Sequence, residues 1–307
     1  MIHQHIIDTS KTLTYLERAR EGQIAEASKF GVPDIDEYLR FKKGNFIVVT
    51  GHANVGKTHT MTYLQLLHTL ENGTRWLVYS SENEVQSLQR KLIEFLAGKP
   101  INQIDEPTFW RHHSYVQAHW AFLDSELIVD AFELLQIARE VYDAWEFEGF
   151  LIDPYNSLTI KKDNVIAGST HEYHYEVTSN IRKFCKEYRV TTIVNTHPVT
   201  QALRKVHTGS HEYAGHTMPV MASDVEGGGK FVNRSDEFIC IHRYISHERD
   251  WIYTDVHIRK VKELESGGRP TALNDPIRLR SKVGNCGFEI KGLDLITKER
   301  IIDESPF

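Results

Sequence analysis

Eight residues between a predicted strand and a predicted helix constrain this chain most. The β-forming run Phe46–Thr50 leads directly into Gly51-His52-Ala53-Asn54-Val55-Gly56-Lys57-Thr58, which fits the pattern GxxxxGK[ST]. Glycines let backbone N–H groups approach phosphate oxygens, and the N-terminus of a helix favours anions. The pattern therefore predicts a nucleotide-binding loop, in which Lys57 meets the β- and γ-phosphates and the Thr58 hydroxyl is a ligand of Mg²⁺.

Short β-forming runs alternate with stretches of helical periodicity over most of the chain. The runs are continuously apolar, as strands must be when both faces of a sheet are covered. The predicted strands are Phe46–Thr50, Trp76–Tyr79, Phe150–Ile152, Val190–Val194 and Phe238–Ile241, and the predicted helices are Thr58–Leu70, Val85–Ala97, Ser125–Trp145 and Glu172–Tyr188. After about residue 236, strands follow one another and include Trp251–Lys260 and Cys286–Ile290. We expect an α/β fold whose mainly parallel sheet has an antiparallel C-terminal extension.

The 307 residues fit two average domains or one large α/β domain. No Pro/Ser linker interrupts residues 29–307, which we expect to form one domain, with residues 1–28 as a separate N-terminal arm. Within the arm, Thr12–Glu21 is a predicted helix with Leu13 and Leu16 on one side. A helix this short is marginal alone, so it packs on its own domain or, as we favour, on a neighbouring subunit.

Composition excludes several classes of protein. With 40% hydrophobic and 25% charged residues, the chain is neither disordered nor of low complexity. The formal charge of −6 argues against a domain that is basic overall, but not against a local basic strip. The three cysteines form no CxxC and no apolar stretch reaches 18 residues, so we expect a cytoplasmic protein without membrane contact. The 17 histidines include no HExxH, which favours scattered surface histidines over a metal centre.

Two acidic residues follow predicted strands. Glu82 comes after Trp76–Tyr79, and Asp153 ends the run that begins at Phe150. Parallel sheets bind their ligands at the carboxyl ends of the strands. Glu82 is therefore a candidate for orienting or deprotonating an attacking water, whereas we assign to Glu84 the ordinary role of an acid at a helix N-terminus. Asp153 is a candidate ligand of Mg²⁺, directly or through water.

Together these motifs resemble the RecA-like ATPase core of hexameric replicative helicases, the DnaB and Twinkle class, especially its phage and plasmid members. The resemblance covers about residues 30–290 and rests on the phosphate loop, its lead-in at residues 31–45, Ile152–Asn156, Asn195–Pro198 and Gly228–Arg243. The segment from Glu82 to Arg90 matches the one that carries the family's catalytic glutamate. The resemblance implies ATP and Mg²⁺ as cofactors, nucleotide contacts from the phosphate loop and Arg90, and a His197 that senses the γ-phosphate.

The chain departs from the family near the end of the Trp251–Lys260 strand. There the family carries Lys-x-Arg, whose arginine reaches the nucleotide of the neighbouring subunit, but this chain has Lys260-Val261-Lys262. A lysine supplies charge without the planar fork of an arginine. Lys262 therefore replaces the intersubunit arginine, Arg259 or Arg269 takes its role, or Lys260 and Lys262 are ordinary solvated charges.

The resemblance also implies DNA contacts in two loops that face the central channel of a ring. Lys161 and Lys162 lie in the first loop, and Arg204 and Lys205 begin the second, which extends from Thr200 to Gly229. A loop of this length in a compact domain is usually functional or disordered. Few aromatic residues are interleaved there, so contact with the phosphate backbone is favoured over base stacking, and solvated lysines on loops are the alternative.

The sequence predicts an ATP-driven motor that forms a homo-oligomer, a hexamer by the resemblance, and translocates on single-stranded DNA, with a primase or a helicase loader as further partner. Two alternatives stay open. One is a RecA- or KaiC-like recombinase or regulatory ATPase. The other, kept open by Lys262, is a nucleotide-binding assembly or loader subunit with little hydrolysis.

Overall fold

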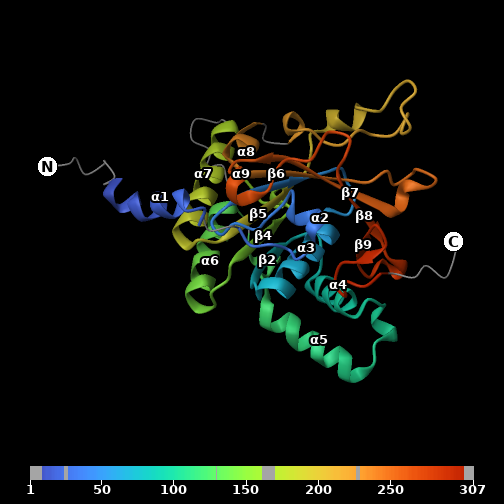
Figure 1. Ribbon diagram of the computed structural model, residues 1–307, viewed down its shortest axis with the longest axis horizontal. Coiled ribbons are helices and arrows are strands. Elements are labelled where there is room, and N and C mark those ends of the chain that lie inside the picture. Colours follow the sequence, from blue (N-terminus) through green and yellow to red (C-terminus); the bar gives the residue numbers. More distant parts are fainter. Residues whose placement is uncertain (1–8, 24–26, 129, 161–169, 226–228, 301–307) are drawn as a thin grey trace.

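The computed structural model describes residues 9–23, 27–128, 130–160, 170–225 and 229–300, and ten strands of these residues form one sheet (Figure 1). The strand order is β10-β9-β8-β7-β6-β1-β5-β4-β2-β3. The strands are β1 (Phe46–Thr50), β2 (Trp76–Ser80), β3 (Trp120–Phe122), β4 (Gly149–Asp153), β5 (Thr191–Thr196), β6 (Glu237–His242), β7 (Tyr253–Val261), β8 (Ile277–Ser281), β9 (Phe288–Ile290) and β10 (Leu293–Asp294). All pairings from β3 to β6 are parallel and those from β6 to β10 are antiparallel, so the predicted fold class is confirmed.

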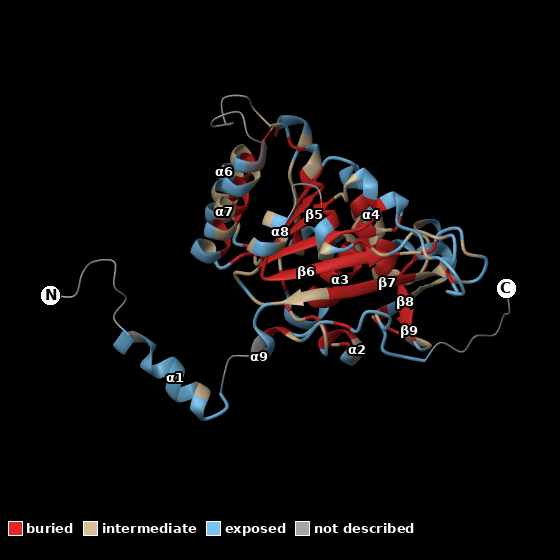
Figure 2. Ribbon diagram, turned by 90° about the horizontal axis from the view of Figure 1, so that it is seen from above, coloured by how far each residue is buried: buried red, intermediate tan, exposed pale blue. Residues whose placement is uncertain are grey.

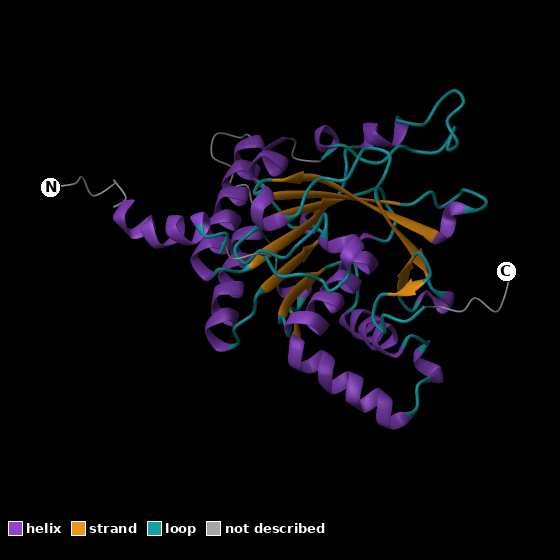
Figure 3. Ribbon diagram, viewed as in Figure 1, coloured by secondary structure: helices purple, strands orange, loops and turns teal. Residues whose placement is uncertain are grey.

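Helices cover both faces of this sheet (Figure 3). They are α1 (Leu13–Arg20), α2 (Pro33–Asp36), α3 (Lys57–Asn72), α4 (Val85–Ala97), α5 (Glu106–His119), α6 (Ala131–Ala144), α7 (Thr170–Tyr188), α8 (Gly229–Arg234) and α9 (Leu264–Gly267). In β1, Ile47 and Val49 pack with α3 and α4, whereas Phe46 and Val48 pack with α6 and α7. Burial of each such side chain stabilises the fold by about 1.5–3 kcal/mol, which explains why the strand is apolar throughout.

The helix predicted at Ser125–Trp145 begins later than expected. Ser125–Leu127 is a separate 3-10 turn, and α6 starts at Ala131, so the prediction was wrong at its N-terminal end. Asp130 is the reason, since its carboxylate accepts hydrogen bonds from the backbone N–H groups of Phe132 and Glu133 at 2.9 and 3.0 Å. Leu127, which the helical pattern placed on the buried face, is consequently exposed.

The N-terminal helix α1 lies apart from the sheet in two perpendicular views (Figures 1 and 2). None of its described side chains is buried, and Leu13, Tyr15 and Leu16 are each more than half exposed. Packing on its own domain is therefore not seen among the described residues. The division into an arm of residues 1–28 and a domain of residues 29–307 stays a prediction, as does docking on a neighbouring subunit. No helix in the described parts of the chain is long and apolar enough to span a bilayer.

Glu237, the first residue of β6, makes stability depend on pH. The side chain is buried, and burial raises the pKa of its carboxyl from 4.5 to about 8, although Asn45 donates a hydrogen bond of 3.0 Å to Oε1. The folded chain favours the protonated form, so this contribution to the free energy of unfolding is full below pH 4.5 and is lost as pH rises to about 8.

Glu237→Gln, which cannot ionise, is therefore expected to lose less thermal stability than the wild type as pH rises through this window. Melting curves recorded every half unit of pH test this expectation. Two parallel profiles would contradict it.

Candidate nucleotide site

The phosphate loop joins β1 to α3, and each of its two glycines has a structural cause. A Cβ on Gly51 would lie 2.3 Å from the carbonyl oxygen of Ile241, so no other residue fits beside β6. Gly56, which precedes the first residue of α3, has φ of +87°, a left-handed conformation that glycine adopts at little cost. Asn54 also has a positive φ, of 62°. This backbone presents the N-terminus of a 16-residue helix at the carboxyl edge of the sheet.

Lys57, the first residue of α3, is folded back over the loop that precedes it. Its Nζ donates to the carbonyl oxygens of Gly51 at 3.0 Å and His52 at 3.1 Å. Burial lowers the pKa of the ammonium group, and the nearby carboxylates of Asp153 and Glu82 act in the opposite direction. The charge therefore lies where phosphate oxygens would compete with backbone carbonyls for it.

Asp153, the last residue of β4, is held from two sides. Thr58 Oγ1 donates to its Oδ2 at 2.6 Å, and Asn195 Nδ2 donates to its Oδ1 at 2.8 Å. Burial raises the pKa of this carboxyl, and the two hydrogen bonds and Lys57 oppose the rise. A hydroxyl and a carboxylate in contact form a hard oxygen donor set, and a cation would offset the cost of burying the negative charge. The residues thus fit Mg²⁺ bound with a nucleotide.

Glu82 and His197 approach each other from two different strand ends. Glu82 follows β2, His197 follows β5, and His197 Nε2 lies 3.3 Å from Glu82 Oε1. Asn156 holds the histidine backbone, because its Oδ1 accepts from His197 N at 2.8 Å and from Thr196 Oγ1 at 3.0 Å. In contrast, Glu84 is exposed at the start of α4 and accepts from Gln86 at 2.7 Å. The structure thus separates the two glutamates that the sequence offered.

Two amide side chains in this site received no role from the sequence. Asn195 orients Asp153 and Asn156 holds His197, and both lie in motifs that were noted only for their neighbours. The signal for Asn195 was a fully buried amide in an otherwise apolar and threonine-rich strand, because such a group needs a polar partner.

Arg90 is not brought into this cluster. It is an exposed residue in the second turn of α4, and it makes no hydrogen bond or ion pair with the described residues of the phosphate loop. Its predicted contact with the nucleotide is a proposal that these contacts do not carry.

The lysines at the predicted finger position lie at the opposite edge of the sheet, because β7 runs antiparallel to β6. Lys260 Nζ donates to the carbonyl oxygens of Val232 and Ser235, both at 2.6 Å, so it binds the end of α8. Lys262 is half exposed, and its Nζ lies 3.3 Å from Asp236 Oδ1. Of the two, Lys262 is the more available to a partner.

The two arginines considered as substitutes are also engaged or enclosed. Arg269 forms an ion pair with Glu37 and lies over the ring of Tyr38 at 4.7 Å. Arg259 extends from β7, and its buried Nε has no hydrogen-bond partner among the described residues. Within the described parts of the chain, neither arginine contacts the phosphate loop.

The second predicted DNA loop is more structured than expected. Residues 198–225 form a closed loop, since Pro198 pairs with Val225 and Val199 N donates to Asp224 O at 2.7 Å (Figure 3). The loop contains two 3-10 turns, Thr200–Arg204 and Ala222–Asp224. Arg204 is exposed, whereas Lys205 forms an ion pair of 2.5 Å with Asp224. Lys161 and Lys162 lie outside the described residues.

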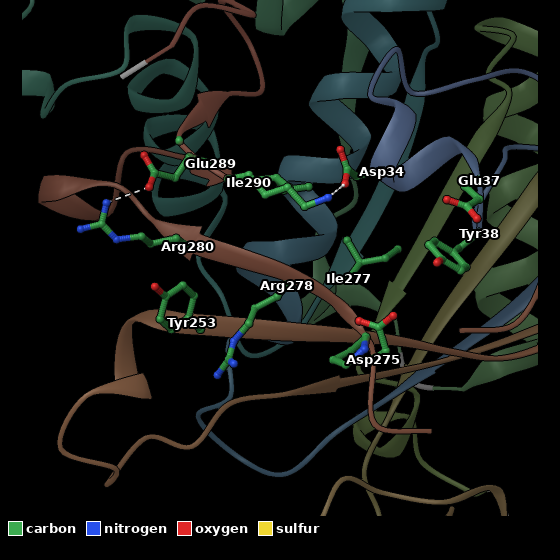
Figure 4. Close-up of a pocket in the computed structure, with 13 residues that line it drawn as sticks. Asp34, Glu37, Tyr38, Tyr253, Asp275, Ile277, Arg278, Arg280, Glu289 and Ile290 are labelled. Carbon is green, nitrogen blue, oxygen red and sulfur yellow. Dashed lines mark hydrogen bonds and ion pairs between the residues drawn. The ribbon is translucent and has the colours of Figure 1, made fainter. Parts of the chain in front are cut away.

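A cavity of about 670 Å³ opens elsewhere, between α2 and strands β7 to β9 (Figure 4). Its wall carries charges of both signs, and an ion pair of 2.7 Å joins Arg280 to Glu289. Tyr38 and Tyr253 also line it, but none of the lining residues belongs to the phosphate loop. This cavity is therefore separate from the nucleotide site.

Comparison with known proteins agrees with this architecture. A solved structure of an isolated ATPase domain superposes with a TM-score of 0.70 at 14% identity, covering 92% of this chain and 98% of that one. A DnaB-like replicative helicase, solved with regard to its interactions with primase, gives 0.67 at 14% identity over 93% and 67%. The chain has the RecA-like fold of a replicative-helicase ATPase core. A KaiC-like protein of Pyrococcus horikoshii has the same general fold, with a TM-score of 0.55 at 17% identity over 86% and 97%.

Sequence comparison gives one more relative and a limit. A Twinkle homologue of Arabidopsis thaliana, described as chloroplastic/mitochondrial, is 23% identical over 254 residues, which are 77% of this chain. The chain spans only 33% of the length of that relative. No protein-family model matches the chain. The RecA-like fold and the resemblance to replicative helicases are thus supported, whereas the roles of the individual residues are proposals.

Proposed function

We propose that this chain is an ATP-hydrolysing motor that assembles as a ring of six copies and translocates on single-stranded DNA during replication. The observation that carries the proposal is the convergence of Lys57, Thr58, Asp153, Glu82 and His197 at one edge of the sheet. Strands β1, β2, β4 and β5 bring them together, although they are up to 140 residues apart.

Each side chain has a role that its contacts allow. Lys57 leaves the carbonyl groups of Gly51 and His52 and binds the β- and γ-phosphate oxygens. Thr58 and Asp153 hold Mg²⁺, which neutralises the charge that develops on the phosphates. Glu82 orients and deprotonates the attacking water, because it is exposed enough to reach solvent and close enough to respond to Lys57. His197 contacts Glu82 and senses the γ-phosphate from the start of the 198–225 segment.

Assembly and DNA contacts complete the proposal. Arg204 and Lys205, with Lys161 and Lys162, supply positive charge for the phosphate backbone of the single strand. Lys262 acts on the nucleotide of the neighbouring copy, and the exposed apolar side of α1 docks on a neighbour. A primase or a helicase loader is the further partner.

The decisive experiment measures ATPase activity with and without single-stranded DNA on samples whose native mass is determined in the same buffer. We expect a species of six copies whose turnover rises when the single strand is added. A monomer without turnover would contradict the proposal, and a long filament with turnover would favour a recombinase-like function.

One observation favours a second candidate, a nucleotide-binding assembly or loader subunit with little hydrolysis. Lys262 is paired with Asp236 of its own chain, and a lysine lacks the planar fork that stabilises a transferring phosphoryl group. The same assay separates the two functions, because a loader would bind nucleotide without measurable stimulation by the single strand.

A further inference from the structure

His52, the second residue of the phosphate loop, faces away from the expected phosphates and toward the 198–225 segment. Its ring is buried, and Nε2 lies 3.1 Å from the carbonyl oxygen of Met218. A carbonyl only accepts, so Nε2 carries the proton and donates it. The contact joins residues 166 positions apart and links the nucleotide site directly to the segment expected to contact DNA.

The segment is a closed unit that His52 holds near its middle. Its ends meet at the Pro198–Val225 pairing, and its interior is tied by backbone bonds from His207 N to His216 O at 2.9 Å and from Met218 N to Lys205 O at 2.8 Å. A displacement of Met218 is therefore passed to Lys205 through one hydrogen bond. Arg204 is the next residue along the chain.

Beneath the segment lies a cavity of about 270 Å³, lined on one side by Met218 and Met221 and on the other by Arg259 and His257 of β7. The imidazole nitrogens of His257 are buried and have no hydrogen-bond partner among the described residues. The segment thus does not pack tightly against this part of the sheet. It has room to shift without breaking a close-packed core.

His52 is also connected to the phosphate-binding lysine. Its own carbonyl oxygen accepts from Lys57 Nζ at 3.1 Å, while its ring donates to Met218. When Lys57 turns to phosphate oxygens, that carbonyl loses its donor, and the backbone of His52 is free to change orientation. The ring is fixed to that backbone and carries the change to the Met218 carbonyl.

We propose that His52 is a positioning residue that transmits nucleotide binding at Lys57 to the 198–225 segment through its Nε2 hydrogen bond to Met218. The inference rests on the nucleotide binding in the proposed function, but not on DNA unwinding. It adds a second connection to that of His197, which reaches only the start of the segment. His52 acts in the middle of the segment, where it bears on Lys205.

Hydrogen exchange of the full chain tests the inference. Exchange of peptides that cover residues 205–218 is followed with and without saturating Mg²⁺ and a non-hydrolysable ATP analogue. In the wild type we expect the analogue to change the exchange rate of these amides by about fivefold or more, the lower range of measured couplings between sites. In His52→Ala the change is expected to fall below about twofold.

Two further variants make the result specific. His52→Gln keeps an N–H donor at a similar reach and is expected to restore most of the response. His113→Ala, on α5 and away from the segment, is expected to respond as the wild type does. Binding of a fluorescent ATP analogue to each variant sets the saturating concentration, and melting curves verify that each variant is folded.

The outcomes separate the inference from the proposed function. Equal responses in the wild type and in His52→Ala would overturn the inference alone, as would loss of the response in both His52→Ala and His52→Gln with the analogue bound. A wild type that binds the analogue without any change in residues 205–218 would overturn it as well. A wild type that binds no analogue would overturn the proposed function first.

Discussion

Replacing Lys57 by alanine is expected to lower the rate of ATP hydrolysis by at least about 100-fold, the usual cost of removing one donor aimed at the developing charge. The reason is positional, since Lys57 is the one cation found in contact with the described phosphate loop, and its charge is partly buried between Asp153 and Glu82. Phosphate release at saturating ATP measures the effect. A melting curve is needed beside it, because the variant also loses two hydrogen bonds to the loop.

Lys91→Ala is the matched control for this variant. Lys91 lies on α4, and its ion pair with Glu94 involves no residue of the site. Hydrolysis by this variant is expected to stay within about twofold of the wild type, because surface ion pairs contribute little. Turnover that survives in Lys57→Ala would remove the proposed mechanism.

Replacing Glu82 by glutamine should lower turnover by roughly 10²–10⁴-fold while ATP still binds, since a general base typically contributes that much. The amide keeps the size of the side chain and can still contact His197, but it accepts no proton from water. Single-turnover hydrolysis and binding of a fluorescent nucleotide, measured on the same sample, separate chemistry from affinity.

The chain supplies a close control for Glu82. Glu84 is only two residues away and is exposed, but it contacts Gln86 rather than the site. Glu84→Gln is therefore expected to hydrolyse ATP at nearly the wild-type rate. Similar losses in the two variants would mean that neither carboxylate has a specific role, and loss of binding in Glu82→Gln would assign it to affinity instead.

Much of the central sheet was predictable, because its strands are continuous apolar runs. Phe46–Thr50 was predicted with its observed bounds, and burial on both faces explains why. Elements with few buried residues were missed. Helix α5 buries only Val116 among its described residues, so its periodicity is weak, although Asp105 and Pro107 are a recognisable N-terminal signal. Strand β3 has three residues and depends on pairing with β2.

The site was predictable where one motif specifies the chemistry and the local structure together. The phosphate loop did so, and Asp153 could be placed because it ends a strand. What sequence cannot give is the partner of a charge. Lys205 and Lys260 looked like free cations, but Asp224 and two carbonyl groups engage them. Contacts over 19 to 28 residues, such as these, depend on how loops close over the sheet.

The antiparallel direction of β7 has a consequence for counting sites. Lys262 and the phosphate loop lie at opposite edges of the sheet, separated by the length of β1, about 16 Å at 3.3 Å per residue. A Lys262 that acts on a nucleotide therefore acts on one held by another copy, and the two contacting surfaces are unlike. A row of n copies that does not close then has n − 1 complete sites. Closure into a ring supplies the last one, so the end copies of an open row differ in competence from every other copy.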